Sequence, residues 1–253
     1  MAPVSTTAVL LRSHDYGETS RVLRFYTEAY GLLSVMARGV RKRSAKGTTA
    51  LVTFATGTLT AYIKPHRDLQ TMKDFDCTRL REGLGLDVLR FAGASATAEL
   101  VLAHADQERN PDLLHALEQG LDTLEAVDVA QVPAAALSAV WRITEAFGFA
   151  PQLDPCVRCG EPLADDSVGR FDFASGGIRC AGCAEDAAGP RMGPLARAQI
   201  ASLLACEFDS ELTYARRHLG VLSDFVAYHV VSRPLKSFRF LGGLLPPDEG
   251  VGA

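Results

Sequence analysis

Two Cys-x-x-Cys pairs constrain this chain more than any other feature. Twenty residues separate the inner cysteines, and the four are Cys156, Cys159, Cys180 and Cys183. Each pair places two thiolates on one side of a tight loop, and two such loops supply the four sulfur ligands of a tetrahedral Zn²⁺, with Zn–S near ~2.3 Å. Residues 168–173 and 177–179 predict a hairpin that holds the second loop against the first. The spacing therefore favours one structural zinc ion in a zinc-ribbon-like element at about 154–188.

Other uses of paired cysteines fit the sequence less well. A thioredoxin-type redox site needs a βαβ context that is absent, and disulfides conflict with the cytoplasmic location that we expect. A cytidine-deaminase-type site needs a His-x-Glu sequence upstream, and the chain contains none. An iron–sulfur cluster is the main alternative that stays open.

The first 80 residues predict a small closed β-sheet. Five short runs of strand-forming residues, several with alternating polarity, are separated by turn residues; they are 6–12, 21–27, 32–37, 57–63 and 69–75. Five short strands suit an OB-type barrel. We therefore expect an α+β chain that begins with a five-stranded OB-type domain at 1–80.

The remaining residues, 81–253, predict an all-α domain into which the cysteine element is inserted. Five segments have helical patterns or helix-start signals, and they are 86–105, the stretch after Asn110, 133–147, 195–206 and 212–232. Asn110 and Pro111 are favoured at a helix N-cap and at its first turn. We expect a disordered tail from about residue 243.

Charge is distributed unevenly between these two parts. Residues 1–80 hold twelve Lys or Arg against six Asp or Glu, a net of +6, whereas 81–253 hold 14 against 24, a net of −10. The segment 38–46 contains five cations and no acid, and its cations are Arg38, Arg41, Lys42, Arg43 and Lys46. Cations spaced along a loop can neutralise successive phosphates. A merely solvated loop is the alternative, but the missing acids favour nucleic-acid binding.

Neighbouring strands and turns of the barrel supply secondary candidates for phosphate contact. They are Arg12, Arg21, Arg24, Lys64 and Arg67. Four aromatic residues are candidates for stacking on bases, namely Phe25, Tyr26, Tyr30 and Tyr62. Aromatic residues in short strands more often lie in the core, which is the interpretation that we favour for them.

The sequence predicts a protein that is not an enzyme and does not enter a membrane. Its six histidines form no recognisable nucleophile–base set, and no Gly-rich Walker loop ends in Gly-Lys-Ser/Thr. No run of eighteen apolar residues without charge is present, and the first residues do not resemble a secretory signal. We expect a cytoplasmic, nucleoid-associated protein.

Several short motifs follow one another along the chain, and they are Gly17-Glu18, Thr27-Glu28, Gly31-Leu32, Arg38-Gly39-Val40-Arg41 with Ser44, the four-cysteine element, His229, Leu235-Lys236-Ser237 and Phe240-Leu241. In this order they resemble the motifs of the RecO family of bacterial DNA repair and recombination mediators. The resemblance extends to about residue 242. It implies an OB-fold, a helical domain and an inserted zinc element, with the basic segment as the DNA contact and the cysteines as zinc ligands.

The resemblance also implies a function. Family members bind single- and double-stranded DNA, anneal complementary strands and act with RecR, and with RecF in some settings, to help RecA displace single-strand-binding protein. One alternative from another class stays open, namely a zinc-ribbon module that binds a protein and contacts DNA only incidentally.

Overall fold

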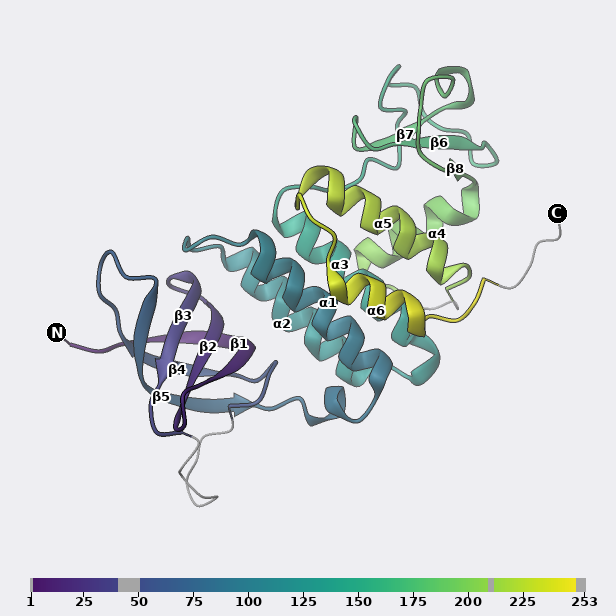
Figure 1. Cartoon of the computed structure of the whole chain (residues 1–253). Helices are drawn as coiled ribbons and strands as arrows, with labels where there is room; N and C mark the ends of the chain where they lie inside the picture. The colour runs from purple at the N-terminus through teal and green to yellow at the C-terminus, as the bar shows by residue number, and fades with distance from the viewer. Residues whose placement is uncertain (1, 41–50, 209–211, 249–253) are drawn as a thin grey trace.

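A β-barrel at the start of the chain is followed by a helical body into which a small second sheet is inserted (Figure 1). The computed structural model describes residues 2–40, 51–208 and 212–248. No helix within these ranges is both long and apolar enough to cross a membrane.

The barrel is closed by five strands, as the sequence predicts. They are β1 (Val4–Tyr16), β2 (Ser20–Thr27), β3 (Gly31–Ala37), β4 (Thr56–Tyr62) and β5 (Leu69–Arg79). The order around the barrel is β1-β2-β3-β5-β4; β3 and β5 are parallel, and the other pairs are antiparallel. Alternate side chains point inward, among them Leu10, Phe25 and Phe75, so that the interior is a packed apolar core without a channel.

Two strands are longer than predicted. Residues 14–16, expected as part of a turn, continue β1 because His14, Asp15 and Tyr16 pair with the start of β2. β5 likewise continues past residue 75 to Arg79, where Cys77 pairs with Gly57 of β4. Turn-forming residues at 14–18 obscured this pairing, which depends on residues of the partner strand.

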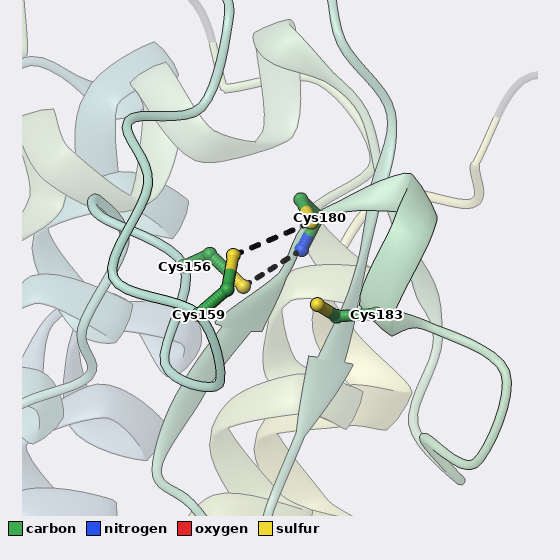
Figure 2. A group of neighbouring side chains, drawn as sticks. All are labelled: Cys156, Cys159, Cys180 and Cys183. Atoms are coloured by element: carbon green, nitrogen blue, oxygen red, sulfur yellow. Dashed lines mark hydrogen bonds between the residues drawn. The ribbon is translucent and has the colours of Figure 1, made fainter.

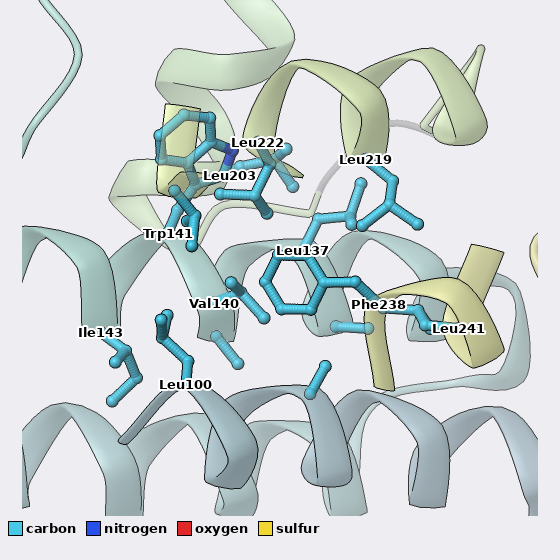
Figure 3. Packing of buried hydrophobic residues seen from close by; sticks show 14 of the residues in the cluster. Leu100, Leu137, Val140, Trp141, Ile143, Leu203, Leu219, Leu222, Phe238 and Leu241 are labelled. Carbon is cyan, nitrogen blue, oxygen red and sulfur yellow. The ribbon is translucent and has the colours of Figure 1, made fainter. Parts of the chain in front are cut away.

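The helical body surrounds one almost fully buried helix, α3 (Val132–Ala146). Its other helices are α1 (Val88–His104), α2 (Pro111–Ala126), α4 (Pro194–Ala205), α5 (Ala215–His229) and α6 (Lys236–Leu244), with 3₁₀ turns η1 (Glu82–Gly85), η2 (Val129–Gln131) and η3 (Ala181–Cys183). Trp141 of α3 packs against Phe225 of α5 with ring centroids 5.2 Å apart, and Figure 3 shows the surrounding leucines. The core of the chain therefore centres on α3.

Helix ends follow local chemistry where the sequence supplies a cap. The side chain of Asn110 accepts a hydrogen bond from the Leu113 N–H, and Pro111 opens α2 as predicted. α5 begins at Ala215 and not at 212, because Tyr214 has left-handed backbone angles that end the preceding turn. α6 extends past residue 243, where we expect the tail to start, since Leu241 and Leu245 are buried.

The barrel packs directly on the helical body. Outward-facing side chains of β1, β2 and β3, among them Val9, Tyr26 and Leu32, belong to the same apolar cluster as the helices. The Tyr26 hydroxyl donates to the Asn110 carbonyl at 3.2 Å, and the Leu32 N–H donates to the Asp106 carbonyl at 2.9 Å. Burial raises the pKa of Tyr26 to about 12, which keeps this donor protonated.

A buried arginine at the junction joins the two parts. The Arg81 guanidinium donates to the Phe54 carbonyl at 2.7 Å and to the Thr56 hydroxyl at 2.8 Å, and it pairs with Asp122 of α2. Only 1% of this side chain is exposed. Arg81 thus ties the start of β4 to the helical body.

Candidate metal centre and nucleic-acid interface

The cysteine element consists of two tight turns and a small sheet. The sheet has the order β7-β6-β8, from β6 (Gly169–Asp172), β7 (Gly177–Arg179) and β8 (Arg191–Met192), which confirms the predicted hairpin. In the first turn the Gly160 N–H donates to the Cys156 carbonyl at 2.9 Å, and in the second the Cys183 N–H donates to the Cys180 carbonyl at 3.0 Å.

The two turns bring the four cysteines together (Figure 2). Their sulfur atoms all lie within 4.8 Å of one another, and the Sγ atoms of Cys159 and Cys180 are 3.9 Å apart. A tetrahedral ion with Zn–S of ~2.3 Å places its sulfurs about 3.8 Å apart, so this spacing fits such an ion. The four predicted ligands therefore form one compact group that could bind a metal.

Backbone N–H groups near the cysteine sulfurs favour the thiolate form, which is the form that binds a cation. The Cys180 N–H donates to the Cys156 sulfur at 3.2 Å. Burial raises the pKa of Cys156, but backbone N–H groups of Cys159, Cys180 and Arg158 outweigh burial and lower it to about 6. Contacts with the sulfurs of Cys180 and Cys159 raise the pKa of Cys183 to about 12. The group therefore favours ionisation of Cys156 and disfavours ionisation of Cys183. A bound cation would remove this conflict, because its positive charge stabilises several thiolates at once.

The element is anchored to the helical body as well as to its own turns. Phe171 and Ile178 are fully buried, and Phe171 packs against Phe225 of α5 with ring centroids 6.0 Å apart. The Ile178 N–H donates to the Gln152 carbonyl, and the Ile178 carbonyl accepts from the Val157 N–H, both at 3.0 Å, which links the hairpin to the first turn. Part of the apolar core of this element is therefore shared with the helices.

Four of the five cations of the basic segment 38–46 lie outside the described residues. They are Arg41, Lys42, Arg43 and Lys46. Arg38 is described, and it is an exposed residue directly after the last residue of β3. Arg21 lies near it, because Arg21 pairs with Ala37 in the sheet. Arg21 also forms an ion pair with Asp15 at 3.1 Å. The structure thus brings Arg21 and Arg38 to one end of the barrel.

The other four candidates lie in two places. Arg12 and Arg24 pair across β1 and β2, on the side of the barrel that approaches α1. Lys64 and Arg67 are exposed in the loop between β4 and β5 (Figure 1). Within that loop the Gln70 side chain donates to the carbonyls of both residues, at 3.0 and 2.6 Å, and so fixes its shape.

Two of the four aromatic candidates lie in apolar clusters, as we expect for aromatic residues in short strands. Phe25 lies in the barrel core and Tyr26 in the interface with the helices, so neither is available to a base. Tyr30 and Tyr62 are half-buried. Tyr16, at the end of β1, is a further exposed aromatic residue, with an exposed fraction of 60%.

Comparisons with known proteins match nearly the whole chain. The family model for the recombination protein O N terminal covers residues 1–81, and the model for its C terminal covers residues 85–239. A DNA repair protein RecO of Anaeromyxobacter sp. (strain K) is 33% identical over 97% of this chain and 98% of its own length. Proteins of the same name from Desulfatibacillum aliphaticivorans and Nocardioides sp. are 31% and 28% identical over 96% and 92% of this chain, and over 98% and 97% of their own lengths.

These matches agree with the barrel and the helical body on either side of residues 81–85, and they indicate no enzymatic family. This chain therefore belongs to the RecO family of DNA repair proteins.

Proposed function

We propose that this protein is a recombination mediator that binds single- and double-stranded DNA through its barrel and anneals complementary strands. With RecR, and with RecF in some settings, it helps RecA load on DNA that single-strand-binding protein covers. Its place of action is the cytoplasm, at the nucleoid. The observation that carries this proposal is the basic amino-terminal barrel, net +6 over residues 1–80, in a chain matched to the RecO family over nearly its full length.

The mechanism that we infer needs no covalent chemistry. Cations at the end of the barrel, Arg21 and Arg38 among them, share phosphates with a strand that another protein already holds, which lowers the barrier to exchange. Two strands screened on the same cationic surface repel each other less, so annealing follows from the same charges. The acidic body limits this attraction to the barrel.

Titration of a fluorescent oligonucleotide at several salt concentrations tests DNA binding. We expect the logarithm of the affinity to fall linearly with the logarithm of salt concentration, with a slope set by the number of phosphates contacted. A flat salt response, or no binding at low ionic strength, would contradict the proposal. Acceleration of RecA loading on covered single strands, with and without RecR, tests the mediator step.

Charge reversal separates the mediator from the alternative interaction module. The variant Arg41→Glu/Lys42→Glu/Arg43→Glu should lose DNA binding and keep its protein partner. A matched triple on exposed arginines of the helical body, Arg109→Glu/Arg233→Glu/Arg239→Glu, should retain most of its DNA affinity. Equal DNA affinity of the first variant and the unmodified protein would favour the interaction module.

We further propose that the cysteine group holds one structural Zn²⁺. Four cysteine sulfurs that are close enough to coordinate one ion tetrahedrally favour zinc. Such a set leaves no open coordination position for catalysis. Elemental analysis should find one zinc per chain, and Cys159→Ser should lose it. Iron in place of zinc, or no metal, would overturn this assignment.

A further inference from the structure

Contacts that need no bound metal hold both cysteine turns in place. The Val157 N–H of the first turn donates to the Ile178 carbonyl of β7 at 3.0 Å. Cys180 and Cys183 of the second turn pack against the apolar cluster of the helical body. In this arrangement all four sulfurs lie within 4.8 Å of one another. Packing and backbone hydrogen bonds therefore keep the thiols together.

The four thiols differ in their access to solvent. Cys159 is exposed and Cys180 is half-buried, whereas only 1% of Cys156 is exposed. The Sγ atoms of Cys159 and Cys180 are 3.9 Å apart although the two residues belong to different turns (Figure 2). These sulfurs need to approach by only about 2 Å to reach the ~2.05 Å of an S–S bond. Cys159 is thus the thiol that a dissolved oxidant reaches first, and Cys180 supplies a second sulfur in contact with it.

We propose that Cys159 is a site of reversible oxidation, at which hydrogen peroxide converts the Cys159–Cys180 pair into a disulfide and releases the bound zinc. The inference rests on the proposed structural zinc and gives its site a second covalent state. Because the turns are anchored independently of the metal, Cys180 stays close enough to trap the oxidised sulfur before it is oxidised further. In a reducing compartment such a disulfide is transient, which suits a redox-sensing role.

The reaction proceeds in two balanced steps. First, the Cys159 thiolate attacks one oxygen of hydrogen peroxide; an S–O bond forms, the O–O bond breaks, and the leaving hydroxide takes up a proton as water. The Cys180 thiolate then attacks the Cys159 sulfur; an S–S bond forms, the S–O bond breaks, and the second hydroxide leaves and takes up a proton as water. Two thiolates thereby lose two electrons, and one peroxide is reduced to two waters. Cys156 and Cys183 alone are too few to hold a tetrahedral ion, so the metal leaves.

Oxidation of the full, zinc-loaded chain tests the site. With a small excess of hydrogen peroxide we expect release of the bound zinc, measured with a metallochromic dye, and loss of two of the six free thiols. Peptide mapping by mass spectrometry should find the Cys159–Cys180 disulfide. Dithiothreitol followed by added zinc should restore the starting state. The emission of Trp141, the only tryptophan of the chain, should not change, because the element stays anchored on the helical body.

Two variants separate the pair from the other thiols. Cys159→Ser should form no disulfide within the cysteine group under the same oxidant; this variant is scored by peptide mapping alone, because it should lack zinc. Cys206→Ser is the matched control, since Cys206 is half-buried like Cys180 but lies outside the group. It should release zinc and form the disulfide like the unmodified protein.

The outcomes are distinguishable from those of the parent proposal. A sulfinic acid at Cys159 without any disulfide, a disulfide between Cys156 and Cys159, or a change in Trp141 emission on oxidation would overturn the oxidation site. A preparation that contains no zinc would overturn the structural zinc alone, because peptide mapping of the oxidised chain still decides whether the Cys159–Cys180 disulfide forms.

Discussion

Arg81 is a charged residue in a position that normally excludes charge. Its guanidinium is buried between β4 and α2, and three acceptors satisfy it. Burial of an ion is tolerated only when such partners compensate for lost hydration. Sequence reasoning could not find this role, because Phe54, Thr56 and Asp122 are distant in the chain.

Asp122→Asn should destabilise the protein by about 2 kcal/mol, because a buried arginine then keeps its charge without its carboxylate. The estimate is at the low end for a buried pair, since 33% of the Asp122 side chain is exposed. Urea unfolding measures the change. Asp186→Asn is the control, because its ion pair with Arg158 is exposed and should contribute little.

Gly31 has a left-handed backbone conformation and lies close to the backbone of the segment before α2. Its φ is +58°, and a Cβ would lie 2.5 Å from the Asp106 carbonyl oxygen. Gly31→Ala should therefore cost about 2–4 kcal/mol by urea unfolding. Gly148→Ala, at φ +92° with open space around it, should cost about 1 kcal/mol. Equal losses would show that backbone conformation alone matters.

The contact between α4 and α5 depends on a neutral imidazole. Buried His218 on α5 hydrogen-bonds Gln199 on α4 at 2.9 Å, and burial lowers the pKa of His218 to about 4, opposed by the charge of Asp248. The unfolded state therefore binds a proton below pH 6.5 before the folded state does. The contribution of His218 to the free energy of unfolding is fully present above pH 6.5 and is lost as the pH falls towards 4.

We expect His218→Gln to be less stable than the unmodified protein at pH 7 and to lose less stability between pH 6.5 and 4. Between pH 7 and pH 4.5 the difference between the two pH dependences should be about 2.5 kcal/mol. Urea unfolding at pH 7 and pH 4.5 measures it. His115→Gln, an exposed position on α2, should follow the unmodified protein. Parallel curves for His218→Gln would contradict the assignment.

The cysteine element should respond to metal removal locally. Chelation should increase amide exchange in the two turns and in β7 but leave α3 protected, because Phe171 and Ile178 remain packed in the helical core. Exchange read by mass spectrometry distinguishes these segments. Cys206→Ser, outside the element, should respond to the chelator like the unmodified protein. Global loss of protection on chelation would mean that the metal holds the whole body.

For the helices and strands, the sequence predicted the type of an element better than the residues at which it begins and ends. Alternation and spacing identified five strands and the β6–β7 hairpin, since both signals are local. The ends of β1 and α5 were missed because they depend on pairing with β2 and on the left-handed backbone at Tyr214. The grouping of the four cysteines followed from their spacing alone, whereas the nearness of Arg21 and Arg38 requires the register of β2 and β3.

Over the whole molecule, the outer face of the barrel shares one apolar cluster with the helical body, while the barrel interior forms a second. We therefore expect them to unfold together. Amides of β2 and of α3 should show the same dependence on urea in hydrogen exchange, and Asp122→Asn should lower both by the same amount. Higher protection in α3 than in β2 under every condition would instead indicate two independent domains.

The position of β5 has a consequence for synthesis of the chain. Since β5 lies between β3 and β4, the sheet cannot close until residue 79 has been made, although four of its strands are complete by residue 62. A nascent chain on the ribosome therefore presents two open strand edges while these residues emerge. Such edges are the features that chaperones and neighbouring chains recognise, so the interval before β5 arrives is the period of greatest risk of misassembly.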